Sequence, residues 1–110
     1  MPARTDIAGE ALQPMPDVDR IIHEPARFQI LARLYVVESA DFLFLLRQTG
    51  MTKGNLSSHM RKLEEAGYLE VVKDFVGRKP HTMLGLTKTG RAAFRDYCRS
   101  MKKVFHDLPG

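Results

Sequence analysis

The sequence predicts a mainly α-helical domain with one small antiparallel β-hairpin. Two observations support this class. Apolar residues recur at three- and four-residue spacing along most of the chain from residue 17 onward, and the pattern becomes strand-like only between Gly67 and Thr87. A chain of 110 residues, of which 44% are hydrophobic, also has the length of one domain and the apolar side chains to form its core.

The first sixteen residues show no sustained pattern. They contain three prolines and one glycine, so we expect residues 1–16 to be a flexible N-terminal arm. The domain proper is expected to occupy residues 17–110. Asp17 is a suitable N-cap for a first helix, in which Ile21 and Ile22 are the apolar positions.

A second helix is expected to begin at Pro25 and to end near residues 38–39. Proline suits the first helical position because its missing N–H group needs no partner there. A short third helix is expected over residues 41–49, with Ser39 or Asp41 as its N-cap. The predicted inward-facing residues are Phe28, Leu31, Leu34 and Tyr35 in the second helix, and Phe42, Leu45 and Leu46 in the third.

A tight turn separates the third helix from a fourth. Gly50 ends the third helix, and Thr52 is a good N-cap because its hydroxyl can accept the unpaired N–H groups of the next turn. We expect the fourth helix to cover residues 52–66. Its buried side is predicted by three residues at i, i+4 and i+7 spacing, which are Leu56, Met60 and Leu63.

Two strand-like segments follow Gly67. Residues 69–86 are expected to form the hairpin, with residues 76–80 at its tip, where a glycine and a proline indicate a turn. Thr87 is a suitable N-cap for a last helix over residues 88–106. The predicted order is therefore three helices, a tight turn, a fourth helix, a hairpin and a final helix.

Charge is divided unevenly along the chain. Residues 1–50 carry five Lys/Arg and seven Asp/Glu, whereas residues 51–110 carry twelve Lys/Arg and six Asp/Glu. The net charges of −2 and +6 sum to the +4 of the whole chain. A basic half favours a polyanionic partner, and nucleic acid is the first candidate.

Composition argues against several other classes. No apolar run approaches the roughly 18 residues that indicate a transmembrane helix, and the N-terminal region lacks the pattern of a signal peptide. The single cysteine, Cys98, can form neither an internal disulfide nor a paired-cysteine zinc site. We therefore expect a cytoplasmic protein that needs no metal or cofactor and has no membrane partner.

The two helices joined by residues 49–52 form a helix-turn-helix, a motif whose second helix fits the major groove of DNA. Short polar side chains early in residues 52–66 let that helix lie deep in a groove, and Arg61 and Lys62 can reach phosphates or a guanine edge. The N–H groups after Thr52 also direct the positive end of the helix dipole at phosphate. The residues predicted to contact DNA from this helix are Thr52, Lys53, Asn55, Ser57, Ser58, Arg61 and Lys62.

The hairpin adds three cations to this surface. Lys73 lies on its first strand, and Arg78 and Lys79 lie at its tip beside a glycine and a proline. An arginine on a narrow projecting turn can enter the minor groove next to the helix site.

Three segments together resemble a known family. They are TKGNLSSHMRKLEEAGYL at residues 52–69, GRKPH at residues 77–81 and LTKTG at residues 86–90. At these separations they resemble the winged-helix DNA-binding domain of small bacterial and archaeal transcriptional regulators related to MarR and ArsR proteins. The resemblance extends over roughly residues 20–100, and its three linked motifs make it specific.

The resemblance implies a winged helix-turn-helix that forms a homodimer and binds a palindromic promoter site in double-stranded DNA. It implies that residues 52–66 are the recognition helix and that residues 69–86 are the wing. Lys53, Asn55, Ser57, Ser58, Arg61 and Lys62 would then contact bases or phosphates, and Lys73, Arg78 and Lys79 would be wing contacts. The chain lacks the cysteine pairs of ArsR metal sensors and the longer terminal helices of full MarR proteins, so a small-molecule effector has no support.

A dimer also has support from the residues themselves. Apolar side chains recur in steps of three and four along residues 88–106, well past the hairpin, where a domain this small offers little surface to cover them. A second copy of the chain would cover them, and two-fold symmetry is the default for such pairs. The residues expected at the dimer interface are Ile21, Ile22, Phe94, Tyr97, Cys98, Met101, Val104 and Phe105.

Two alternatives remain at this point. A winged-helix module that docks another protein through the same faces would have the same sequence features, because a fold does not fix a function. A redox switch at Cys98 is the other alternative, although free cysteine on an apolar seam usually packs as a small hydrophobic residue. No spacing of catalytic residues points to an enzyme. His59, at the edge of the buried stripe, is expected to be a packed, hydrogen-bonded histidine and not a ligand.

Overall fold

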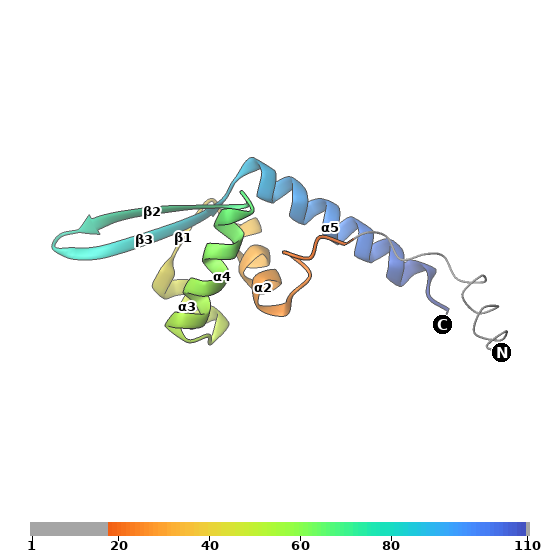
Figure 1. Ribbon diagram of the computed structural model, residues 1–110, viewed down its shortest axis with the longest axis horizontal. Coiled ribbons are helices and arrows are strands. Elements are labelled where there is room, and N and C mark those ends of the chain that lie inside the picture. Colours follow the sequence, from red (N-terminus) through yellow and green to blue (C-terminus); the bar gives the residue numbers. More distant parts are fainter. Residues whose placement is uncertain (1–17, 110) are drawn as a thin grey trace.

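The computed structural model describes residues 18–109, in which helices pack on one face of a small antiparallel sheet (Figure 1). The strand order in the sheet is β1-β3-β2. The helices of this range are α2 (Pro25–Tyr35), α3 (Phe42–Thr49), α4 (Lys53–Glu65) and α5 (Lys88–Asp107), and the strands are β1 (Ala40–Asp41), β2 (Leu69–Val76) and β3 (Lys79–Leu86). The predicted class, mainly α with a small antiparallel sheet, is confirmed.

The predicted first helix is wrong for the part of it that is described. Residues 20–22 form a turn, in which the N–H of His23 donates to the carbonyl of Asp19 at 2.7 Å. The Asp19 carboxylate accepts the N–H groups of Ile21 and Ile22 at 2.9 and 3.2 Å. A carboxylate that satisfies backbone donors locally offers the chain an alternative to a helix. The arm at residues 1–16 and the cap at Asp17 lie outside the described residues.

Helix α2 begins at Pro25 as predicted but ends at Tyr35, three residues before the earlier of the two expected ends. The chain leaves the helix there because Ala40 and Asp41 pair with β3 and make β1, a strand that the sequence did not predict. A strand of two residues is too short to show an alternating pattern.

Helices α3 and α4 follow the predicted local signals. Asp41, not Ser39, caps α3, and its carboxylate accepts the N–H of Phe44 at 2.7 Å. Gly50 has φ +70°, the left-handed conformation that ends a helix without steric cost in glycine. The hydroxyl of Thr52 accepts the N–H of Asn55 at 3.1 Å and so starts α4.

The hairpin covers the expected residues 69–86, but its tip is tighter than expected. Strands β2 and β3 pair from Leu69 with Leu86 out to Val76 with Lys79, so that only Gly77 and Arg78 form the turn. Gly77 has φ +67°, which suits the two-residue turns that match the twist of a hairpin. The predicted five-residue tip was too wide because three of its residues continue the ladder.

One hydrophobic core lies between the helices and the sheet. Helix α2 is central to it and packs against α3, α4, α5 and β3. In Figure 1 the hairpin projects from one side of this core and the C-terminal half of α5 from the other. Within residues 18–109, no helix is both long and apolar enough to cross a membrane. The buried apolar residues are Ile22, Ile30, Leu31, Leu34, Ala40, Leu45, Leu56, Met60, Leu63, Leu69, Leu84 and Phe94.

Gly90 fixes how α5 leaves the sheet. A Cβ at this position would lie 2.1 Å from the carbonyl oxygen of Tyr68, which accepts the N–H of Thr87 at 3.1 Å. We expect Gly90→Ala to lower the free energy of unfolding by about 1–3 kcal/mol, because backbone atoms must move to admit the methyl group. Gly54→Ala is the matched control. That position has open space and an ordinary φ, so we expect no loss and a small gain in helix propensity. Denaturant unfolding of both variants checks this, and equal stability of the two would contradict it.

Cys98 is half-buried on the apolar side of α5. Burial raises the pKa of its thiol, and the nearby Lys102 offsets this only in part. We expect Cys98 to react more slowly than free cysteine with an aromatic disulfide reagent at neutral pH, because the thiolate is the nucleophile. Its rate should still be rising above pH 9.0, the ordinary value for this thiol. The denatured chain is the control and should react at the rate of free cysteine. Fast, pH-independent reaction near neutrality would instead favour a redox role.

Candidate nucleic-acid interface

Helix α4 has one buried side and one exposed side. Leu56 and Leu63 are fully buried and Met60 nearly so, as the i, i+4, i+7 spacing predicts. This packing holds the opposite side of the helix in solvent. Of the predicted contact residues, Ser57 is half-buried, and the exposed ones are Thr52, Lys53, Asn55, Ser58, Arg61 and Lys62.

A buried arginine supports α4 from behind. Arg27 of α2 is only 9% exposed, and its guanidinium lies 3.2 Å from Nδ1 of His59 on α4. The same guanidinium donates to the carbonyl oxygens of Ile21 at 2.6 Å and Arg20 at 3.4 Å. His59 is therefore hydrogen-bonded and packed, as expected. Arg27 was missed, although its spacing from Leu31 and Leu34 places it on the buried side of α2.

A second group ties the N-terminal segment to the base of the hairpin. The hydroxyl of Tyr68 donates to the carboxylate of Asp19. Burial, together with this hydrogen bond, raises the pKa of Tyr68 to about 12. The hydroxyl thus stays protonated as a donor, and the residue that closes the turn at 20–22 is held against the end of α4.

His81 links the hairpin to the start of α3. Its Nδ1 lies 3.0 Å from a carboxylate oxygen of Asp74 across the ladder, and its Nε2 lies 3.9 Å from Asp41, the N-cap of α3. The sequence alone does not indicate this contact, because the pairing register that joins His81 to Asp74 is not visible in a linear pattern. In the described part of the chain, no group of three His, Cys, Asp or Glu residues could hold a metal ion.

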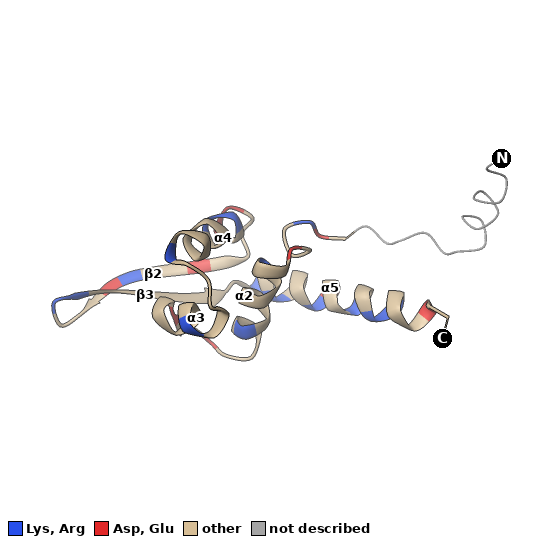
Figure 2. Cartoon of the chain, turned by 90° about the horizontal axis from the view of Figure 1, so that it is seen from below, with Lys and Arg blue, Asp and Glu red and all other residues tan. Residues whose placement is uncertain are grey.

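Two groups of cations differ in their contacts. Four arginines are engaged in hydrogen bonds or an ion pair within residues 18–109: Arg27, Arg33, Arg91 and Arg99. The cations predicted to contact DNA form no ion pair with any described residue. Figure 2 shows their charge on α4 and at the hairpin tip. The cations predicted to contact DNA, all of them exposed, are Lys53, Arg61, Lys62, Lys73, Arg78 and Lys79.

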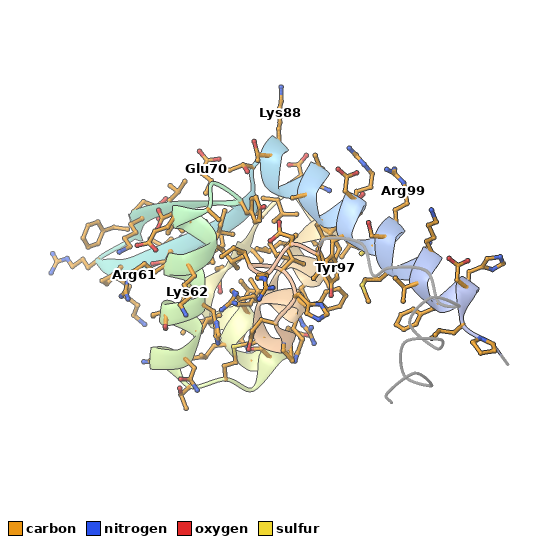
Figure 3. All side chains as sticks on the ribbon, turned by 45° about the vertical axis from the view of Figure 1, so that its right-hand side comes forward. Arg61, Lys62, Glu70, Lys88, Tyr97 and Arg99 are labelled. Carbon is orange, nitrogen blue, oxygen red and sulfur yellow. The ribbon has the colours of Figure 1, made fainter. Side chains whose placement is uncertain are left out.

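Arg61 and the hairpin belong to one surface. In Figure 3, Arg61 lies on the side of α4 next to the hairpin, whereas Lys88, at the start of α5, points away from α4, and Arg99 lies farther along α5. Helix α4 also packs directly against β2. A polyanion that reached Arg61 would thus meet the hairpin as well.

The residues expected at a dimer interface fall into two sets. Ile22 and Phe94 are buried inside the single chain, at 0% and 6% exposure, so we assign them to the core of the monomer. The other residues expected at the interface are half-buried or exposed in the single chain. Most of the α5 residues line an open groove of about 500 Å³ against the start of α2. The groove is lined by residues that include Pro25, Phe28, Tyr97, Cys98, Met101 and Phe105.

Comparison with known proteins agrees with this geometry. A family model described as a winged helix DNA-binding domain matches residues 26–105. An uncharacterized protein of Methanocaldococcus jannaschii is 37% identical over 78 residues, which cover 71% of this chain and 85% of that protein.

Solved structures with a similar fold include two that bear on the function. A transcriptional regulator homologue from Pyrococcus horikoshii OT3 superposes with a TM-score of 0.77 at 30% identity, over 82% of this chain and 91% of that chain. MarR superposes with a TM-score of 0.67 at 20% identity, over 82% of this chain and 68% of that one. The match to the family model covers both α4 and the hairpin. The chain belongs to the winged-helix DNA-binding domain family and has the fold of MarR-type transcriptional regulators.

Proposed function

We propose that this protein is a homodimeric, sequence-specific transcriptional regulator that binds a palindromic operator and represses by occupying the promoter. In this proposal α4 is the recognition helix and enters the major groove. The hairpin is the wing and contacts the adjacent minor groove and backbone. The observation that carries the proposal is the set of exposed, unpaired cations on α4 and on the hairpin.

The chemistry of α4 fits a reading helix. Its exposed side begins with the small residues Gly54 and Ser58 and the amide of Asn55, and it continues with Arg61 and Lys62. Amide and guanidinium groups make the bidentate contacts that distinguish adenine and guanine in the major groove. Lys53 lies in the first turn, where its charge adds to the positive end of the helix dipole. Base readout is therefore assigned to residues 55–62, and phosphate anchoring to Lys53 and the hairpin cations.

The open groove beside α5 supports the homodimer. Its floor is apolar, and the C-terminal half of α5 continues past it with Phe105 at 65% and Leu108 at 57% exposure. Lys102 lines the groove, and other cations of α5 follow one edge of the helix, as Figure 2 shows. A second copy of α5 would remove this apolar seam from water and leave the cations of that edge outside. Two-fold symmetry would then place two α4 helices about 34 Å apart, one helical turn of DNA.

Loss of one cation on the proposed surface tests DNA binding. We expect Arg61→Ala and Arg78→Ala each to weaken binding by about 1–3 kcal/mol with an unchanged unfolding midpoint, because both side chains are exposed. The measurement is fluorescence anisotropy with duplexes selected by the full chain from a random library. Lys88→Ala removes the same charge from a place away from α4 and should bind as the natural chain does.

Salt dependence and sequence complete this test. Binding of the natural chain should fall steeply between low and high salt, since phosphate contacts release counterions, and the selected duplexes should contain an inverted repeat. Recovery of no duplex, or equal losses for Lys88→Ala and Arg61→Ala, would count against the proposal. It would favour a protein-docking module, whose apolar contacts depend little on salt.

A charge placed in the α5 seam tests the homodimer. We expect Phe105→Asp to convert a dimer into a monomer in sedimentation equilibrium without unfolding the domain, because Phe105 is 65% exposed in the single chain. Lys103→Gln is the matched control, since it changes the charge by the same amount on nearly the opposite side of the helix. A natural chain that sediments as a monomer at micromolar concentration would refute the homodimer.

A further inference from the structure

Phe75 is the most exposed aromatic residue of the described range, with 69% of its surface in solvent. It lies on β2, one residue before Val76, which closes the ladder next to the turn. Most exposed apolar residues need no explanation, but this one occupies the end of a projecting hairpin that is otherwise rich in cations. Its surroundings indicate what it contacts.

The pairing register places Phe75 on the side of the hairpin that faces the helices. Side chains alternate along a strand, so Phe75 shares a face with Leu69, which is buried in the core beneath α4, and with Lys73. Phe75 pairs across the ladder with Pro80, and Lys73 pairs with Thr82. From the core outward, this face therefore carries Lys73 with Thr82 and then the apolar pair Phe75 and Pro80.

Phe75 is too far from the core to pack on it. It lies six positions along β2 from Leu69, which is about 20 Å at the rise of a strand. In Figure 1 the outer half of the hairpin extends beyond α3 and α4. On this face, the half-buried residues farthest from the core are Val71 on β2 and Thr82 on β3, and Phe75 lies beyond both of them.

Charge around Phe75 favours a polyanion as the partner. Lys73, Arg78 and Lys79 lie within four residues of it, and all are exposed. The only acid of the outer hairpin, Asp74, points to the opposite face, where it pairs with His81 at 3.0 Å. A duplex is a polyanion with an apolar, stacked interior, and minor-groove proteins insert phenylalanine or proline between its base steps.

We propose that Phe75, backed by Pro80, is a wedge that inserts between two base pairs from the minor groove and kinks the duplex. This inference rests on the proposed function, since the wing must first reach the minor groove. It adds a source of sequence preference that no hydrogen bond supplies. Pyrimidine–purine steps such as TA and CA unstack most easily, so the wedge selects them in the flank of the site.

The experiment uses the full chain and duplexes that it selects from a random library, with 2-aminopurine placed in turn at each flanking position. Unstacking raises the fluorescence of this base. We expect a rise at one step in each flank with the natural chain and its loss with Phe75→Ala. The same variant should lower affinity by about tenfold, the usual order for losing one aromatic–base stack.

Two further variants separate a wedge from a general effect of the hairpin. Phe75→Leu keeps an apolar side chain of wedge type and should retain part of the fluorescence rise. Val76→Ala is the matched control, because Val76 is 63% exposed at the neighbouring position on the opposite face. It should behave as the natural chain does.

The outcomes distinguish this inference from the proposed function. Tight binding with no fluorescence rise, or a rise that survives Phe75→Ala, would overturn the wedge and leave the DNA-binding regulator in place. Failure to bind any duplex would overturn both proposals.

Discussion

The close packing of α5 on the backbone of Tyr68 is the constraint on which the arrangement of the molecule depends. The carbonyl of Tyr68 accepts the N–H of Thr87, its N–H donates to Leu63 at the end of α4, and its hydroxyl holds Asp19. Gly90 lies directly above that carbonyl, where no side chain fits. One residue therefore joins the end of α4, both ends of the hairpin and the first turn of α5. The relative orientation of the proposed reading helix, wing and dimer helix is set at this point.

Much of this architecture could be predicted from the sequence, because its signals are local. The N-caps at Thr52 and Thr87, the stop at Gly50 and the stripe of Leu56, Met60 and Leu63 each depend on residues within one or two turns. What was missed depends on partners distant in the sequence. Strand β1 exists only because β3 is beside it, and the turn at Asp19 is favoured by a tyrosine 49 residues away. The burial of the Arg27 side chain likewise depends on its contact with His59.

The candidate site was predictable in its residues but not in its supports. Every cation singled out on α4 and the hairpin is exposed. Helical periodicity accounts for those on α4, and those on the hairpin are exposed because its outer half extends beyond α3 and α4. Of the residues that hold these elements in place, Arg27 is placed on the buried side of α2 by its spacing, but its contact with His59 is not visible in the sequence. The contact of His81 with Asp74 depends on the pairing register of β2 and β3. Ile22 and Phe94, expected at a dimer interface, are buried in the core of the single chain. An apolar sequence pattern shows that a residue is covered but does not show whether its own chain or a partner covers it.

The uninterrupted ladder of the hairpin, from Leu69 with Leu86 to Val76 with Lys79, limits how such a protein can diversify. One residue inserted into each strand would lengthen the arm by about 3.3 Å but would turn every outer side chain to the reverse side. Two inserted residues per strand would restore the orientation at twice the added length. Relatives whose hairpins differ in length are thus expected to differ by an even number of residue pairs. The hairpin can then become longer or shorter while its outer side chains keep their orientation.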